Sequence, residues 1–180
     1  MEQPGEQMTF AHTIESGLHG LGDDLTPALR EKIREKGIHL DRPLLPAYPR
    51  ATWEAVLGAI AEELYPRVPY DEAHRLVGRR LSQAYNETAI GRAVAESLRV
   101  RGPEHALERM SRTLRSGNNY AETRLTRTGE NAFELWVNET NGSPGYIQGV
   151  LETVMENAGA KAEIEVRSSG GQAATYSIRW

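Results

Sequence analysis

The sequence contains no cysteine, and this single absence excludes several kinds of site. Without cysteine the chain has no disulfide, no thiolate nucleophile and no thiolate metal ligand. It also has no apolar run near the roughly 20 residues that a membrane-spanning helix needs. The opening segment MEQPGEQMTF lacks the basic and apolar regions of a secretion signal. These absences predict a cytoplasmic protein with no membrane partner.

Sequence motifs for nucleotide binding and nucleophilic catalysis are missing as well. There is no G-x-S-x-G, no Walker A sequence and no G-x-G-x-x-G. The glycines of SGLHGLG (16–22) mimic part of a phosphate loop, but no lysine follows them. The five histidines form no HxxxH or HxH pair, and His74 is the first of them to test as a ligand. We therefore expect no metal, no cofactor and no enzymatic activity.

Lysine is absent from residues 75–127, where eleven arginines and five acidic residues give a net charge of +6. The rest of the chain holds 10 basic and 20 acidic residues, so the whole protein carries a charge of −4. Arginine, more than lysine, suits bidentate pairing with carboxylates or phosphates. The acidic balance of the whole chain argues against nucleic acid as the partner.

Two interpretations of this arginine-rich stretch remain open. Its arginines either lie on solvated helix faces and pair with the chain's own acidic parts, or they form a docking face for an acidic protein partner. The docking face would consist of Arg75, Arg79, Arg80, Arg109, Arg112 and Arg115.

Apolar residues before residue 116 recur at the 3.6-residue spacing of amphipathic helices. Residues 26–27 (Thr-Pro) and 102–103 (Gly-Pro) mark two helix starts, because proline is favoured at the first helical position. Thr52 and Asp71 are expected to cap two further helices. The spacing predicts about five helices in this part of the chain.

From residue 117 onward the apolar period changes from 3.6 to 2. Alternation over residues 132–139 predicts a strand, and the whole segment 117–180 is predicted to have the order ββαββ, with a turn at residues 170–171. The predicted fold class is therefore α+β. A single domain is expected, whose mainly helical part, residues 1–116, packs on a four-stranded antiparallel sheet.

The segment RSGNNYAETRL (115–125) lies where the helical period stops. Gly117, Asn118, Asn119 and Tyr120 are interpreted as a structural hinge between helix and strand. Glycine and asparagine tolerate the left-handed backbone that often ends a helix, and asparagine amides can bond free carbonyls and turn amides. A ligand-contacting role for these four residues is the alternative.

The chain has more tyrosine and tryptophan than a simple core needs, because their polar tips require partners when buried. Ordinary helix–sheet packing, a protein interface and an apolar pocket between helices and sheet are the three interpretations. The candidate ligand pocket would be lined by Trp136, Tyr146, Val150 and Tyr176.

Several segments resemble one known family. They include PLLPAYPRATW (43–53), RGPEHALERMSRTLRSGNNYAETRL (101–125), PGYIQGVLETVMENAGAK (144–161) and YSIRW (176–180). Together they are similar to the myxobacterial paralogous family of unknown function, domain of unknown function 2378. The resemblance covers nearly the whole chain, and it implies no catalytic residues because the family has no established reaction.

A second resemblance concerns the C-terminal pattern of strand, helix and two strands. It is similar to the vinyl-reductase-4-type domain, which shares a ligand-binding fold with transport-particle subunits and haem–nitric-oxide sensor domains. This resemblance implies a helical front, a terminal antiparallel sheet and a tendency to dimerise or to bind apolar molecules. The chain lacks both the cysteines and the tyrosine–serine–arginine haem motif of these relatives, so the resemblance carries over neither metal nor haem.

Two functional hypotheses follow from these features. The first is a non-enzymatic cytoplasmic protein-interaction or regulatory module, a homodimer in bacterial signalling that docks through its arginine-rich helices. Under this hypothesis, Arg79→Glu with Arg80→Glu should abolish partner capture without unfolding the protein. The alternative is a sensor domain that binds an apolar or aromatic small molecule between the late helix and the sheet.

Overall fold

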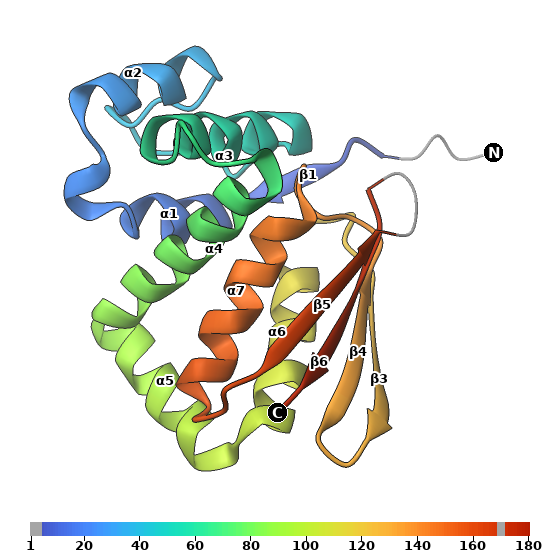
Figure 1. Cartoon of the computed structure of the whole chain (residues 1–180). Helices are drawn as coiled ribbons and strands as arrows, with labels where there is room; N and C mark the ends of the chain where they lie inside the picture. Colours follow the sequence, from blue (N-terminus) through green and yellow to red (C-terminus); the bar gives the residue numbers. More distant parts are fainter. Residues whose placement is uncertain (1–4, 169–171) are drawn as a thin grey trace.

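The computed structural model describes residues 5–168 and 172–180, and it confirms the predicted α+β fold. The helices are α1 (Ala11–His19), η1 (Gly22–Asp24), α2 (Pro27–Glu35), α3 (Arg50–Leu64), α4 (Tyr70–Glu87), α5 (Ala89–Arg101), α6 (Pro103–Ser116) and α7 (Pro144–Asn157). The strands are β1 (Met8–Phe10), β2 (Ala47–Pro49), β3 (Thr123–Gly129), β4 (Ala132–Val137), β5 (Glu163–Ser168) and β6 (Ala174–Arg179). Helices α6 and α7 lie against one face of the β3–β6 sheet, and α1, α2 and α3 gather near one end of α4 (Figure 1).

The predicted helix starts at residues 26–27 and 102–103 are confirmed, because α2 begins at Pro27 and α6 begins at Pro103. Oγ1 of Thr26 accepts a hydrogen bond from the amide of Leu29 (3.2 Å), directly before the proline that opens α2. Oγ of Ser143 caps α7 in the same way, through the amide of Gly145 (3.1 Å). These caps satisfy amides that the first helical turn leaves without backbone partners.

The predicted caps of α3 and α4 are wrong. Helix α3 begins two residues before Thr52, and α4 begins one residue before Asp71. Each helix follows a proline, Pro49 or Pro69, whose extended backbone occupies the N-cap position without a side-chain cap. Because proline fixes its own φ, it sets the direction in which the chain enters the helix.

The large sheet is antiparallel throughout, in the order β3-β4-β6-β5, as the ββαββ pattern predicts. Leu135 and Val166 lie opposite Tyr176 on its two sides, and all three residues face the helices. The predicted turn at residues 170–171 lies outside the described residues. The sequence did not predict β2, a three-residue strand that pairs with β1 inside a segment rich in proline. Such a short strand at a sheet edge tolerates proline because it needs few backbone amides.

Two clusters of buried side chains form the core. One lies among α1, α2, α3 and α4 and includes Leu29, Trp53 and Ile60, which are almost fully buried. The other lies between α6, α7 and the sheet and includes Leu107 and Leu151. Burying each large aliphatic or aromatic side chain contributes about 1.5–3 kcal/mol. None of the described helices combines the length and apolar character needed to cross a membrane.

Helices α4 and α7 pack backbone against backbone at three glycines. A Cβ atom added at Gly145 would lie 1.9 Å from the carbonyl oxygen of Asp71, and one at Gly78 would lie 2.2 Å from that of Tyr146. A Cβ at Gly149 would lie 2.0 Å from the carbonyl oxygen of Arg75. These distances are far below any van der Waals contact, so the helical and strand-rich parts meet along a seam that admits only glycine.

Candidate functional site

Residues 117–120, the predicted hinge, lie between α6 and β3. Gly117 ends α6 with φ of −83°, and neither Asn118 nor Asn119 has a positive φ. The expected left-handed backbone is therefore wrong. Gly117 is required by crowding instead, because a Cβ atom there would lie 2.6 Å from Oγ1 of Thr13. That hydroxyl donates a hydrogen bond to the Gly117 carbonyl oxygen (3.0 Å).

The two asparagine side chains hold the chain on both sides of this junction. Nδ2 of Asn118 donates to a carbonyl oxygen in the last turn of α6 (3.0 Å), and its Oδ1 accepts from the amides of Tyr120 (3.0 Å) and Ala121 (2.6 Å). Oδ1 of Asn119 accepts from the amide of Met8 in β1 (2.7 Å). All of these bonds are internal, which supports the structural interpretation over ligand contact.

Tyr120 completes the junction from a partly buried position. Its hydroxyl contacts Oγ1 of Thr9 in β1 (3.0 Å) and donates to Oδ1 of Asn141 in the β4–α7 loop (3.0 Å). Burial raises the pKa of Tyr120 above its ordinary value. The four hinge residues thus join β1, the end of α6 and the loop before α7.

A buried ion pair lies beside this junction. Arg50 at the start of α3 contacts the carboxylate of Glu139, a residue that is only 6% exposed, and its Nε lies 3.3 Å from Oε1 of Glu54. Burial raises the pKa of Glu139, the charge of Glu54 adds to this rise, and Arg50 opposes it. The ion pair thus links the start of α3, in the helical part of the chain, to the segment that follows β4 in the sheet.

The α4 arginines of the predicted docking face pair with carboxylates of the same chain. Arg75 Nη1 donates to Glu152 (2.7 Å), and Arg79 donates both to Glu152 (3.0 Å) and to Glu156 (2.9 Å) on α7. Arg80 Nε donates to Asp24 (2.9 Å). These contacts favour the first interpretation for α4, in which the arginines neutralise the chain's own acidic residues.

The α6 arginines behave differently. Arg109, Arg112 and Arg115 are exposed, and no ion pair among the described residues engages them. The six arginines therefore have two different roles. The three on α4 form ion pairs with acidic residues of the same chain, and the three on α6 are exposed to solvent.

The predicted ligand pocket does not form as one cavity. Tyr176 is fully buried, and its hydroxyl donates to the carbonyl oxygen of Pro144 (2.9 Å). Tyr146 and Val150 are partly buried on α7. Trp136 lies on the opposite face of the sheet, because Leu135 and Val137 beside it face the helices. Trp136 stacks there beneath the guanidinium of Arg124, 5.5 Å from the ring centre.

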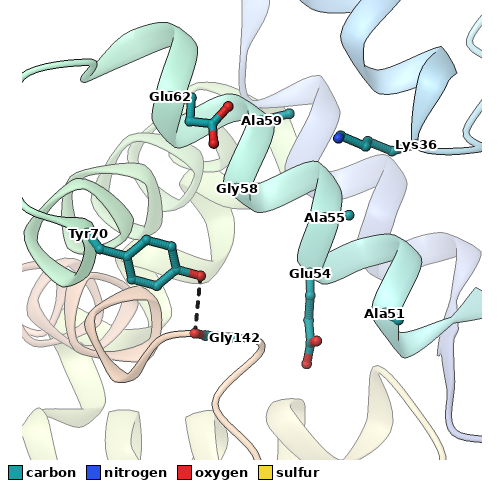
Figure 2. A pocket seen from close by; sticks show the side chains of 9 residues that line it. All are labelled: Lys36, Ala51, Glu54, Ala55, Gly58, Ala59, Glu62, Tyr70 and Gly142. Carbon is teal, nitrogen blue, oxygen red and sulfur yellow. Dashed lines mark hydrogen bonds between the residues drawn. The ribbon is translucent and has the colours of Figure 1, made fainter.

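A different hollow surface lies along α3. Two adjoining hollows of about 380 and 270 Å³ share Gly58, Glu62 and Tyr70, and we call them together the α3 furrow. Figure 2 shows the residues that line the first hollow: small residues lie along α3, with Tyr70 and Gly142 on one side of the helix and Lys36 on the other. The Tyr70 hydroxyl donates to the Gly142 carbonyl oxygen (3.3 Å) across this gap.

The charges of the first hollow are mixed. Glu54 and Glu62 lie on α3, and Lys36 stands near the same helix (Figure 2). Burial raises the pKa of Tyr70, and the charges of Asp71, Glu54 and Glu62 add to the rise. The Tyr70 hydroxyl is therefore kept protonated and remains a hydrogen-bond donor.

The second hollow is more apolar and contains one distinctive polar group, His74. This side chain is 1% exposed, and its Nδ1 lies 2.9 Å from the carbonyl oxygen of Tyr70. A carbonyl can only accept, so Nδ1 carries a proton, and in the neutral tautomer that this bond selects Nε2 is an acceptor. No protein group among the described residues bonds Nε2. A buried acceptor without a partner costs about 1–3 kcal/mol, so a ligand donor here would recover that energy.

The walls around His74 come from α3, α4 and the turn between them. The ring of Tyr70 packs on the imidazole with centres 4.2 Å apart, and Ala61, Val68 and Ala73 add apolar surface. Among the described residues, no three His, Asp or Glu side chains are placed to share a metal ion. The second hollow therefore combines apolar surface with a few polar side chains, those of Glu62, Tyr65, Tyr70 and His74, a combination typical of small-molecule sites.

Sequence reasoning singled out His74 but missed the rest of the furrow. The carboxylate of Glu63 pairs with Lys32 at 2.6 Å, whereas its neighbour Glu62 borders the furrow. A signal for the furrow was present in the sequence: small residues recur at positions 51, 55, 58 and 59, away from the apolar stripe of α3. A helix face without bulky side chains leaves a groove unless a neighbour fills it.

The sequence over residues 7–180 matches the model of the family described as Protein of unknown function (DUF2378). The chain belongs to this family, which confirms the first resemblance. A comparison with curated proteins finds no match.

The fold is that of H-NOX domains, as the second resemblance implied. A protein solved for the study of haem redox potential and porphyrin distortion is 14% identical, with a TM-score of 0.70 over 95% of this chain and 99% of that one. An oxygen-binding H-NOX domain related to soluble guanylate cyclases is 15% identical, with a TM-score of 0.68 over 93% and 92%. The Fe(II) unliganded H-NOX protein from K. algicida is 11% identical, with a TM-score of 0.66 over 94% and 95%.

A haem does not fit between the helices and the sheet of this chain. The space between α6, α7 and the sheet is filled by side chains that are fully buried, among them Leu107, Ile147 and Met155. The glycine contacts between α4 and α7 close the neighbouring gap to backbone distance. The residues present thus make an ordinary packed core where a flat macrocycle would need an open slot.

Proposed function

We propose that the chain is a non-enzymatic, cytoplasmic regulatory module of bacterial signalling whose α3 furrow binds a small molecule. The ligand has an apolar body and one hydrogen-bond donor. The observation that carries this proposal is His74, whose side chain lines the second hollow and whose Nε2 bonds no protein group among the described residues. Because Nε2 is itself buried, a ligand reaches it only when the wall around His74 shifts. The donor of the ligand supplies the missing hydrogen bond, and its apolar body covers the partly exposed Val68 and the exposed ring of Tyr70.

The position of the furrow suits a regulatory role. His74 and Tyr70 belong to α4, and α4 packs through glycine contacts on α7. A ligand that fixes the first turns of α4 therefore acts on the element that connects the helical part to the sheet. Solved proteins of the same fold include an oxygen-binding domain, which supports ligand binding as a use of this fold but says nothing about this site.

The first experiment is a titration of the full chain with indole, phenol and a primary alkylamine. Nitrogen-detected NMR of the imidazole is the readout, because it separates the protonated Nδ1 from the bare Nε2. Binding should move the Nε2 resonance of His74 and leave its Nδ1 tautomer unchanged. The melting temperature should rise with ligand concentration, by the equivalent of about 2.7 kcal/mol at 100 times Kd.

Filling the furrow supplies the matched control. A Cβ atom at Gly58 meets no other atom within 4 Å, so Gly58→Leu places its side chain into the shared part of the two hollows without disturbing the core. This variant should lose both the NMR response and the thermal shift. Ala93→Leu, which places a leucine on the exposed surface of α5, should keep both. Binding that survives Gly58→Leu, or no response to any probe, would remove the furrow from the model.

A second candidate function is protein docking through α6. The observation in its favour is that Arg109, Arg112 and Arg115 are exposed without an ion pair among the described residues. Binding of a fluorescent polyglutamate peptide should weaken in Arg109→Glu with Arg112→Glu, and should weaken with rising salt in the wild type. Equal binding by wild type and variant would leave α6 without a docking role.

A further inference from the structure

The β3–β6 sheet has one face that no helix covers in the described part of the chain (Figure 1). Residues on this outer face alternate with the core residues of each strand. Their registers are fixed by the antiparallel pairing, so they form rows that cross all four strands.

Two of these rows carry opposite charge. The basic row consists of Arg124, Trp136, Thr175 and Arg167, which are successive register partners from β3 to β5. The acidic row consists of Thr126, Glu134, Ser177 and Glu165, which are register partners two residues along each strand. No ion pair among the described residues engages the four charged side chains of these rows. Two residues along a strand place the rows roughly 7 Å apart.

We propose that this outer face binds a second copy of the same chain, in a face-to-face dimer with its twofold axis between the two rows and parallel to them. Rotation about that axis places the basic row of one copy over the acidic row of the other. Arg167 then faces Glu165 of the second copy on β5, and the half-buried Trp136, with the Arg124 guanidinium over its ring, faces Glu134 of the second copy on β4. An axis parallel to the strands would instead place Arg124 over Arg167, which like-charge repulsion disfavours.

The size of the face sets the expected strength. Four strands of about six residues cover roughly 20 by 20 Å, so the two copies together would bury roughly 800 Å² of flat area. This lies at the low end of specific interfaces, and we therefore expect a weak, reversible dimer that salt weakens further.

Sedimentation velocity of the full chain tests this proposal by charge exchange. The wild type should move from 20.0 kDa toward twice that mass as its concentration rises. Arg124→Glu with Arg167→Glu makes both rows acidic, and Glu134→Lys with Glu165→Lys makes both rows basic. Each variant alone should dimerise more weakly by at least roughly tenfold, and an equimolar mixture of the two should form the heterodimer.

The matched control is Arg112→Glu with Arg115→Glu on α6, which makes the same charge change away from the sheet and should still dimerise. A second measurement does not depend on the charge variants folding. Because the chain has no cysteine, Thr175→Cys provides a single site for a short bis-maleimide crosslinker, and Arg112→Cys provides its control. Crosslinked dimer should form through Cys at 175 and not at 112. A wild type that stays monomeric at every concentration, or variants that fail to pair when mixed, would overturn the proposal.

Discussion

Gly149 on α7 lies so close to Arg75 on α4 that a Cβ atom would come within 2.0 Å of the Arg75 carbonyl oxygen. The obstacle is backbone, so no side-chain rotation can relieve it. Helices α4 and α7 would have to move apart to make room, and their contact is what joins the helical part of the chain to the sheet. A glycine in a helix normally costs about 1 kcal/mol relative to alanine, which makes this one a residue kept for packing.

Gly149→Ala should therefore destabilise the protein by about 1–3 kcal/mol or more, in spite of the better helix propensity of alanine. Urea unfolding followed by circular dichroism measures this change. Gly58→Ala is the matched control, because Gly58 is also helical and a Cβ there meets nothing within 4 Å. It should stabilise the protein by about 0.5–1 kcal/mol. Equal effects of the two substitutions would show that the close helix packing contributes no stability.

Asn118→Ala should cost about 1–3 kcal/mol, because it leaves a helix-end carbonyl and two turn amides without their partner. Ser116→Ala is the control, since this exposed hydroxyl makes one local bond to the carbonyl of Thr113 (3.1 Å). It should change stability by less than about 0.5 kcal/mol. If Asn118→Ala is as mild as the control, the junction between α6 and β3 does not depend on this amide and is held by the bonds of Thr13, Asn119 and Tyr120.

Periodicity predicted the strands and their inner faces because alternation is a local property of the chain. Phe133, Leu135 and Val137 are buried, as the pattern requires. The same alternation excludes Trp136 from the inner face, so the predicted pocket combined residues from two faces of one sheet. Local chemistry also predicted that asparagine amides bond helix-end carbonyls and turn amides at the junction, while the reason for Gly117 came from Thr13, more than 100 positions away.

The furrow and the arginine pairs depend on how helices cross, and no local signal carries that information. Glu152 and Glu156 meet the α4 arginines only because α7 returns across α4 late in the chain. The sequence singled out His74 as the first histidine to test, but its bond to the Tyr70 carbonyl one turn earlier, and the lack of a partner for Nε2 among the described residues, depend on how α3 and α4 pack. Sequence periodicity predicts which face of a helix or strand is buried, but it does not predict which other helix or strand packs against that face.

Stability at high pH should depend on Tyr146. Burial raises the pKa of its hydroxyl to about 12, with a smaller contribution from Tyr120. A folded-state pKa above the unfolded value near 10 means that this stability is complete below about pH 10 and is lost as pH rises toward 12. Tyr146→Phe should therefore flatten the loss of unfolding free energy between pH 9 and 11, by roughly 1 kcal/mol at pH 11.

Urea unfolding at a series of pH values gives this slope, and absorbance of tyrosinate near 295 nm locates the late ionisation. Tyr70→Phe is the control, because Tyr70 is 62% exposed and should change the slope much less. A wild type whose slope is unchanged by Tyr146→Phe would show that this hydroxyl ionises without cost in the folded state.

The α4 arginines should respond to substitution as parts of the fold. Arg79 is bonded to two carboxylates on α7, and both its own side chain and that of Glu152 are largely buried. Arg79→Ala should lower the unfolding free energy by about 1–3 kcal/mol, because it leaves Glu152 with one guanidinium instead of two. Arg112→Ala on the exposed surface of α6 should change the unfolding free energy by less than about 0.5 kcal/mol.

Reversing the charges of Arg79 and Arg80 together should therefore destabilise the protein. A docking experiment that relies on this double variant would then confuse unfolding with loss of binding. If both arginines prove equally dispensable in urea unfolding at low salt, the ion pairs between α4 and α7 contribute nothing, and the α4 face returns as a candidate docking surface.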